Sequence, residues 1–144
     1  MSDPVDEETV AALRAAVLVL ARRLRYQVAG DDAPSATEMA VLGRVGRCGP
    51  MTPGQLARAE HVQPPSMTKV IEALEARGLL RRDPHPTDGR QYLVSRTEAA
   101  EAFVAESKKV RSAWLASHLE LLSDADRKAI AAAAPALARL AEQP

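Results

Sequence analysis

The sequence predicts a mainly α fold with a small β-hairpin, in a single domain that spans residues 1–144. Polar residues that cap helices repeatedly precede apolar patterns of helical period, and two short strand-like runs flank a segment rich in proline and glycine. With 47% apolar residues, a chain of this length can bury one core. Because only 3% of the residues are aromatic, aliphatic side chains must fill most of that core.

The first expected helix covers about residues 6–28. Its apolar residues recur every three or four positions, which places them on one face: Val10, Leu13, Val17, Leu20, Leu24 and Val28. Such a long apolar face needs a partner, either the C-terminal helices of the same chain or a second subunit. The segment AGDDAPS is expected to end this helix.

Ser35 and Glu38 have the spacing of a capping box and open a second expected helix. Met39, Leu42 and Val45 line up along it before the stop at CGP, and we expect the helix to support the following segment from behind. Cys48 lies at the end of this helix. We interpret it as a buried, inert thiol, because a redox sensor would need an exposed thiolate.

Two further helices are expected to start near Thr52 and Pro64. Thr52 can act as N-cap, with Pro53 at the first helical position and Gln55 completing a capping box. The break from Glu60 to Gln63 is long enough for a turn between two helices, although it lacks the glycine often found there. The pair therefore predicts a helix-turn-helix.

The second helix of this pair runs from about Pro64 to Arg77. Its buried face is predicted from residues at i, i+3, i+4 and i+7: Met67, Val70, Ile71 and Leu74. The opposite face and its flanks carry Pro65, Ser66, Thr68 and Lys69. The last three of these side chains can donate hydrogen bonds to phosphates or base edges, unless they are merely solvated. The flanking elements favour binding over simple solvation.

The residues after this helix predict a hairpin. Gly78 is the expected left-handed cap, and LLRRD and QYLVSR are short enough and apolar enough to pair as strands. The seven residues PHPTDGR between them are expected to form an exposed tip. A tip that carries Arg90 is suited to entering a DNA minor groove. Together these elements predict a winged helix-turn-helix over about residues 35–97.

Two more helices are expected after the hairpin, over about residues 97–143. Thr97 and Ser123 are the predicted N-caps, and four residues of the last helix are expected to face inward: Ile130, Ala134, Leu137 and Leu140. The long helices at about 6–28 and 97–143 exceed what a small winged helix needs for its own core, so the sequence predicts a homodimer. Such a dimer would bind a near-palindromic operator with half-sites about 34 Å apart.

Residues 55–97 resemble the DNA-binding domain of the MarR family of bacterial transcription regulators. The features that carry this resemblance are the closing motif of the helix pair and the wing, namely Leu74, Glu75, Gly78, Leu79, Asp88 and Arg90. The resemblance implies that the helix from Pro64 is the recognition helix, and that Asp88 fixes the wing so that Arg90 can enter the minor groove. Gln63 would then lie near the DNA backbone. The chain departs from the family pattern at Pro64–Pro65 and at Arg96, where an apolar residue is usual.

These observations support a homodimeric, sequence-specific DNA-binding transcription regulator. By analogy with the family, we expect a repressor that binds double-stranded DNA and that a small aromatic or phenolic effector releases. The family places such an effector between the dimerisation helices and the reading domain, and Tyr26, Met39 and Trp114 are candidates by residue type. The alternative is a winged-helix protein-interaction module without sequence-specific DNA binding, which the acidic residues of the recognition helix favour.

The composition argues against other classes of function. The 19 basic and 19 acidic residues balance to a formal net charge of zero, which argues against a protein that coats nucleic acid through bulk charge. No catalytic residue, metal site or cofactor site is expected, because His61, His85 and His118 are scattered and no phosphate loop is present. With no apolar run of about 20 residues and no signal-peptide pattern, we expect a cytoplasmic protein without a membrane span.

Overall fold

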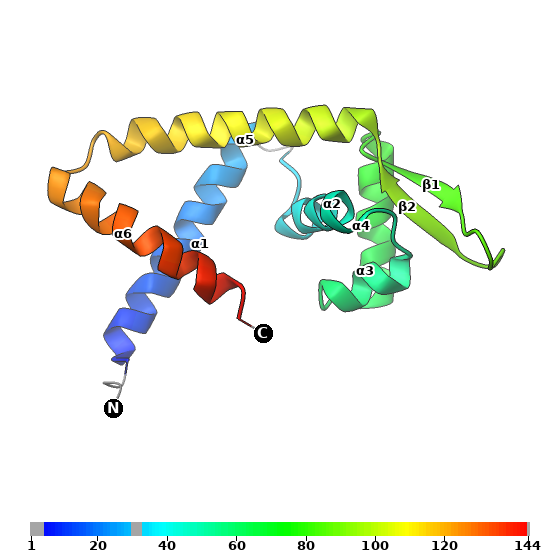
Figure 1. The fold of residues 1–144 in the computed structure, drawn as a ribbon, viewed down its shortest axis with the longest axis horizontal. Coiled ribbons are helices and arrows are strands. Elements are labelled where there is room, and N and C mark those ends of the chain that lie inside the picture. Colours follow the sequence, from blue (N-terminus) through cyan, green and yellow to red (C-terminus); the bar gives the residue numbers. More distant parts are fainter. Residues whose placement is uncertain (1–4, 30–32, 144) are drawn as a thin grey trace.

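The structure is a computed structural model that describes residues 5–29 and 33–143. Its elements are α1 (Glu7–Ala29), α2 (Ala36–Cys48), α3 (Pro53–Ala59), α4 (Pro64–Ala76), β1 (Leu80–Pro84), β2 (Tyr92–Arg96), α5 (Glu98–Leu119) and α6 (Asp124–Ala141). The mainly α fold with one hairpin is therefore confirmed. In Figure 1 the long α5 connects a helical end, made of α1 and α6, to a reading end, made of α2, α3, α4 and the hairpin. The predicted break AGDDAPS falls partly on residues 30–32, which lie outside the described residues.

Local hydrogen bonds explain where the helices begin. The Ser35 hydroxyl accepts from the backbone N–H of Glu38, whose carboxylate accepts from the N–H of Ser35, so the predicted capping box is present. Thr52 and Gln55 make the same reciprocal pair at the start of α3. The predicted caps at the starts of α5 and α6 are also present. Each cap satisfies amide groups that a helix start leaves without an intrahelical partner.

The buried core lies entirely at the reading end. It is aliphatic, as the low aromatic content predicted, and consists of Val41, Leu42, Val45, Leu56, Ala57, Met67, Ile71, Leu74, Leu79, Leu80, Val94 and Ala100. The helix α4 contributes the predicted Met67, Ile71 and Leu74, while Val70 is only partly buried. Because three of its side chains are fully enclosed, α4 has a fixed rotation and a defined outer face.

The hairpin pairs β1 with β2 in antiparallel register, from Leu80 opposite Arg96 to Pro84 opposite Tyr92. The tip was expected to begin at Pro84, but Pro84 is the last residue of β1. A proline can occupy this edge position because no ladder hydrogen bond is required from it. A third short segment also joins β2: Met51 and Val94 exchange two backbone hydrogen bonds, at 3.2 and 2.8 Å between nitrogen and oxygen. This pairing ties the start of α3 to the wing.

The helical end leaves much of its apolar surface uncovered. Val17 and Leu20 of α1 are 48% and 42% exposed, and no residue of α6 is buried. The expectation that Ile130, Ala134, Leu137 and Leu140 face inward is therefore wrong for a single chain. Figure 1 shows α6 turning back from the end of α5 and crossing α1 in this view, and the described residues leave the apolar side chains of α6 exposed.

The interpretation of Cys48 as a buried thiol is also wrong. Cys48 is the last residue of α2 and is exposed. The buried residues of α2 are Val41, Leu42 and Val45. Cys48 continues their spacing, but the packing that buries Val45 does not extend over it.

Candidate nucleic-acid interface

The turn between α3 and α4 is held by backbone hydrogen bonds. The N–H of Val62 donates to the Ala57 carbonyl at 2.9 Å, and the N–H of Glu60 donates to the Leu56 carbonyl at 3.0 Å. His61 adopts a φ of 52°, the left-handed conformation for which glycine is usual. His61 therefore adopts the left-handed backbone conformation that a glycine would usually supply at this turn. The turn sets the position of the first residues of α4.

The outer face of α4 carries the predicted contact residues. Pro65, Ser66, Thr68 and Lys69 are all exposed, on the side of the helix away from the core. Gln63, the N-cap of α4, is also exposed and its side chain makes no capping hydrogen bond. The Thr68 hydroxyl donates to the Pro64 carbonyl at 3.1 Å. In this rotamer Thr68 offers an outside group only its acceptor lone pairs.

A network around Asp88 orders the wing tip. One carboxylate oxygen of Asp88 accepts the backbone N–H of Arg90 at 3.0 Å, and the other accepts the side-chain amide of Gln91 at 3.0 Å. These bonds, the one from Arg90 foremost, hold the pKa of the Asp88 carboxyl below its usual value. His85 Nδ1 in turn accepts the N–H of Asp88 at 3.1 Å. Asp88 thus fixes the backbone beside Arg90, and the entry of Arg90 into a minor groove stays a prediction.

The Arg90 side chain itself is exposed at the end of this ordered tip. Within residues 5–29 and 33–143 its guanidinium makes no hydrogen bond or ion pair. The protein therefore orders the backbone of the tip and leaves the cation available to an outside group.

Side chains also join the base of the wing to its neighbours. Asp83 accepts the Ser95 hydroxyl across the hairpin at 2.7 Å, and this bond is the main cause that lowers the pKa of Asp83. Arg82 donates two hydrogen bonds to Glu75 of α4 and lies over the Tyr92 ring, 4.4 Å from its centroid. A bidentate ion pair therefore holds the wing against α4.

At Arg96 the chain departs from the family pattern. The largely buried side chain of this residue links β2 to α2 and α5. Its side chain is only 12% exposed and extends over Gly46 of α2. One terminal nitrogen donates to the Leu42 carbonyl at 3.3 Å, and the other pairs with Glu101 of α5. The Nε atom is buried without a hydrogen-bond partner among the described residues. Gly46 makes this packing possible, since a β-carbon there would overlap the guanidinium.

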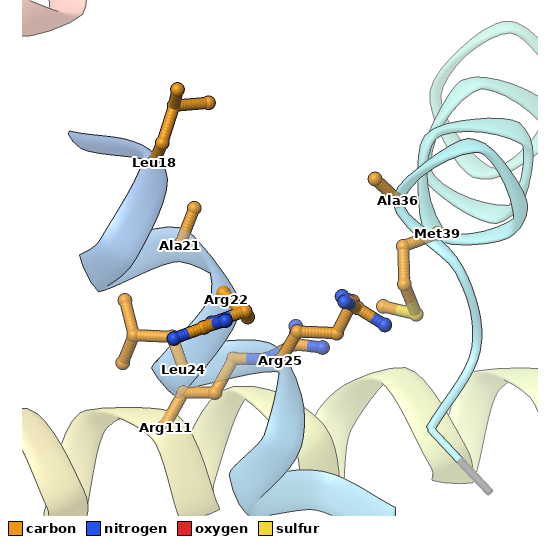
Figure 2. Close-up of a pocket in the computed structure, with 8 residues that line it drawn as sticks. All are labelled: Leu18, Ala21, Arg22, Leu24, Arg25, Ala36, Met39 and Arg111. Atoms are coloured by element: carbon orange, nitrogen blue, oxygen red, sulfur yellow. The ribbon is translucent and has the colours of Figure 1, made fainter. Parts of the chain in front are cut away.

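A cavity of about 490 Å³ lies where α1, α2 and α5 meet. It is lined by Leu18, Ala21, Arg22, Leu24, Arg25, Ala36, Met39 and Arg111. Figure 2 shows the guanidinium groups of Arg25 and Arg111 extending from α1 and α5 towards Met39 of α2. Partial burial lowers the pKa of the Arg111 guanidinium. No carboxylate of the described chain pairs with any of the three arginines of this cavity.

The structure does not bring the three candidate effector residues together. Met39 lines the arginine cavity, whereas Tyr26 lies in a separate hollow on α1. Trp114 lines a third, apolar cavity, where it stacks on His118 with ring centroids 3.9 Å apart. Sequence reasoning missed the arginines of the first cavity. Arg22 and Arg25 carry a weak signal in their spacing of three on one helix, but nothing in the sequence links them to Arg111.

Comparisons with known proteins match this geometry. A model described as the MarR family matches residues 35–92. An HTH-type transcriptional regulator from Mycobacterium bovis, Mb0904, is 37% identical over 138 residues, which cover 96% of this chain and 96% of the relative. This chain belongs to the MarR family. As a member of that family it is a winged helix-turn-helix transcription regulator that binds DNA and is not an enzyme.

Solved structures extend the match over the whole MarR-family chain. A transcriptional regulator protein from Pseudomonas aeruginosa PA01 aligns with a TM-score of 0.83 and 30% identity, covering 98% of this chain and 100% of that chain. BpsR from Bordetella bronchiseptica aligns with a TM-score of 0.66 and 25% identity, covering 99% and 100%. DNA binding by BpsR is regulated by 6-hydroxynicotinic acid.

Residues 5–29 and 33–143 contain no group of three or more histidine, cysteine or acidic side chains that could hold a metal ion. In the same part of the chain, no helix is both long enough and apolar enough to cross a membrane.

Proposed function

We propose that this MarR-family protein is a homodimeric, sequence-specific repressor that binds a near-palindromic operator. The observation that carries the proposal is the pairing of an ordered outer face on α4 with a braced wing beside it. Ser66, Thr68 and Lys69 would contact the major groove, with Pro65 packed against it and Gln63 near the backbone. Arg90 would enter the minor groove from a tip that Asp88 holds in place. Family membership favours this reading over a protein-interaction module.

The dimer has its support in the uncovered surfaces of α1 and α6. A cavity of about 820 Å³ lies between them, and its walls are almost entirely apolar. Val10, Leu13 and Val17 form its α1 side, and Leu137 and Leu140 its α6 side. Water-exposed apolar surface of this kind is costly to leave uncovered, and a second copy of the chain offers the same surface in return. The twofold axis would then place two copies of α4 about one helical turn apart.

We also propose that the effector is a small anionic compound bound in the arginine cavity. Three unpaired guanidinium groups in a partly desolvated, otherwise apolar pocket favour a ligand that has a carboxylate and an apolar body. A volume of about 490 Å³ suits a compound with one or two rings. Because the cavity joins α1 and α5 to α2, such a ligand would favour one spacing of the reading ends over another. Of the three effector candidates proposed from the sequence, Met39 lines this cavity.

The repressor proposal is tested by selecting sheared genomic DNA on the purified, ligand-free protein and sequencing the bound fragments. The expected result is a shared inverted repeat with half-sites about one helical turn apart. A variant with Ser66, Thr68 and Lys69 all changed to alanine is the control, because these exposed residues can change without loss of the core. It should retain the melting temperature and lose the enrichment. Random fragments from a folded dimer would contradict sequence-specific binding.

The effector proposal is tested by adding 6-hydroxynicotinic acid or its neutral amide to the operator complex. The carboxylate is expected to release DNA at a lower concentration than the amide, and Arg111→Gln should remove that difference. Equal potency of the acid and the amide would argue against an anion site.

Since a regulator of bacterial genes acts on chromosomal DNA, we propose a cytoplasmic location.

A further inference from the structure

A second cavity, of about 470 Å³, lies at the turn between α3 and α4. It is lined by Gly54, Ala57, Arg58, His61, Val62, Gln63 and Pro64. The side chains of Arg58, His61 and Gln63 are exposed, and none of them makes a hydrogen bond or ion pair with the described part of the chain. Three polar side chains without partners, one of them a permanent cation, therefore surround the start of the recognition helix.

The start of α4 has few backbone donors of its own. Pro64 and Pro65 occupy the first two helical positions and have no N–H. The N–H of Met67 already donates to the Gln63 carbonyl at 3.0 Å, so only Ser66 and the N-cap residue Gln63 supply free amides at this helix start. Helix starts usually bind phosphates through several such amides. At this helix, side chains would have to supply most of the phosphate contacts.

The charge around the cavity favours an anion. The acidic residue of the turn is Glu60, which does not line the cavity. Its carboxylate accepts a hydrogen bond from Arg44 Nε of α2 at 2.8 Å, so its charge is neutralised by α2. The Glu60 side chain is only 14% exposed. The carboxylate that would otherwise oppose Arg58 is thus paired and turned away from the cavity.

His61 is an unusual choice for its position. Its left-handed φ of 52° would cost glycine nothing, whereas a residue with a β-carbon is strained there. The exposed imidazole makes no hydrogen bond or ion pair within the described protein that would offset this strain. Strained residues of this kind are concentrated at functional sites.

We propose that Arg58 and His61 bind a backbone phosphate of DNA at the start of α4, in place of the amides that the two prolines remove. The inference rests on the proposed DNA-binding function and adds a contact that does not depend on the DNA sequence. It implies that Pro64 and Pro65 do not weaken binding to the DNA backbone, because side chains of the turn bind the phosphate instead. Base reading stays with the exposed residues of α4.

The test uses a duplex of about 30 base pairs of random sequence, since a phosphate contact requires no operator. Fluorescence anisotropy between about 50 and 200 mM salt measures the slope of log affinity against log salt concentration. Arg58→Ala should reduce the slope by about 0.9, the value for one phosphate contact. Lys109→Ala is the matched control, because it removes one exposed cation from α5, away from the turn. It should leave the slope unchanged.

His61→Gly separates binding from folding. Glycine relieves the backbone strain, so the melting temperature should be maintained or rise, while affinity for the random duplex should fall severalfold. A merely structural role would instead predict a more stable protein that binds DNA at least as well. Unchanged affinity in both Arg58→Ala and His61→Gly would overturn the phosphate site but leave the repressor proposal intact. Absence of salt-dependent DNA binding by the unchanged protein would overturn both.

Discussion

Arg82 of the wing donates two hydrogen bonds to Glu75 of the recognition helix, 2.6 Å from Nε and 2.9 Å from Nη2 to the carboxylate oxygens. The pair joins the two elements proposed to enter the two grooves of DNA. Its partial exposure limits its value to the free energy of unfolding to about 1 kcal/mol or less. Its larger effect is geometric, because it sets the angle of the wing relative to α4.

Glu75→Gln is therefore expected to weaken operator binding, by about fivefold, which corresponds to about 1 kcal/mol. A simple electrostatic view predicts the opposite, because the change removes a negative charge near DNA. Glu72→Gln is the matched control: Glu72 is exposed on the same helix and makes no hydrogen bond, so its removal should strengthen binding slightly. Affinities measured at one salt concentration decide the question. Tighter binding by Glu75→Gln would mean that the Arg82–Glu75 ion pair has no role in DNA binding.

Arg90→Ala is expected to weaken operator binding by about 1–3 kcal/mol without lowering the melting temperature. The guanidinium is exposed and unpaired in the described chain, so its loss removes no internal contact. Lys108→Ala, an equally exposed cation on α5, serves as the charge control. If operator affinity is the same with and without Arg90, the wing does not reach the minor groove.

Leu137→Glu is expected to convert the proposed dimer into a monomer. Leu137 lines both apolar cavities of the helical end, and a carboxylate there would have to be desolvated in the interface. Sedimentation at micromolar concentration should show the change, accompanied by loss of operator binding. Lys128→Glu alters charge on the same helix and should leave the dimer intact. A dimer that survives Leu137→Glu would place the interface elsewhere.

Gly46→Ala tests the buried tie of Arg96. Alanine improves helix propensity by about 1 kcal/mol, but it displaces a guanidinium whose charged hydrogen bonds contribute about 1.5–3 kcal/mol each. Loss of even one such bond outweighs the gain in propensity, so a net destabilisation of about 0.5–2 kcal/mol or more is expected in thermal unfolding. In an Arg96→Ala background the same change should become stabilising, because only propensity remains. An equal effect in both backgrounds would show that Gly46 and Arg96 are not coupled.

Order at the wing tip is expected to depend on pH through Asp88. The pKa of its carboxyl is lower in the folded protein than the unfolded value of about 3.9, chiefly through the N–H of Arg90. Its contribution is therefore fully present above about pH 4 and is lost as pH falls through the folded pKa. The protection factor of the Arg90 amide against hydrogen exchange, taken relative to the intrinsic exchange rate at each pH, should fall only in that acidic window. Asp88→Asn should remove the step, and a step near neutral pH would contradict this assignment.

Much of the reading end could be predicted because its signals are local. The capping boxes at Ser35 and Thr52 involve residues three positions apart, and the buried stripe of α4 follows from helical period alone. The exposure of Ser66 and Lys69 follows from the same geometry, since the face opposite a buried stripe must point outward. The glycine cap after α4 is equally local, with Gly78 at a φ of 72°.

The sequence by itself thus determined the helices, the hairpin and which face of α4 is exposed. Only the tertiary structure decided which distant side chains meet: Arg82 with Glu75, Arg96 with Gly46, and Arg111 with the arginines of α1. It also decided that Cys48 is exposed, although a free cysteine is usually buried and was interpreted so from the sequence. The physical reason is that period assigns a residue to a face, whereas burial and pairing depend on what another part of the chain places against that face.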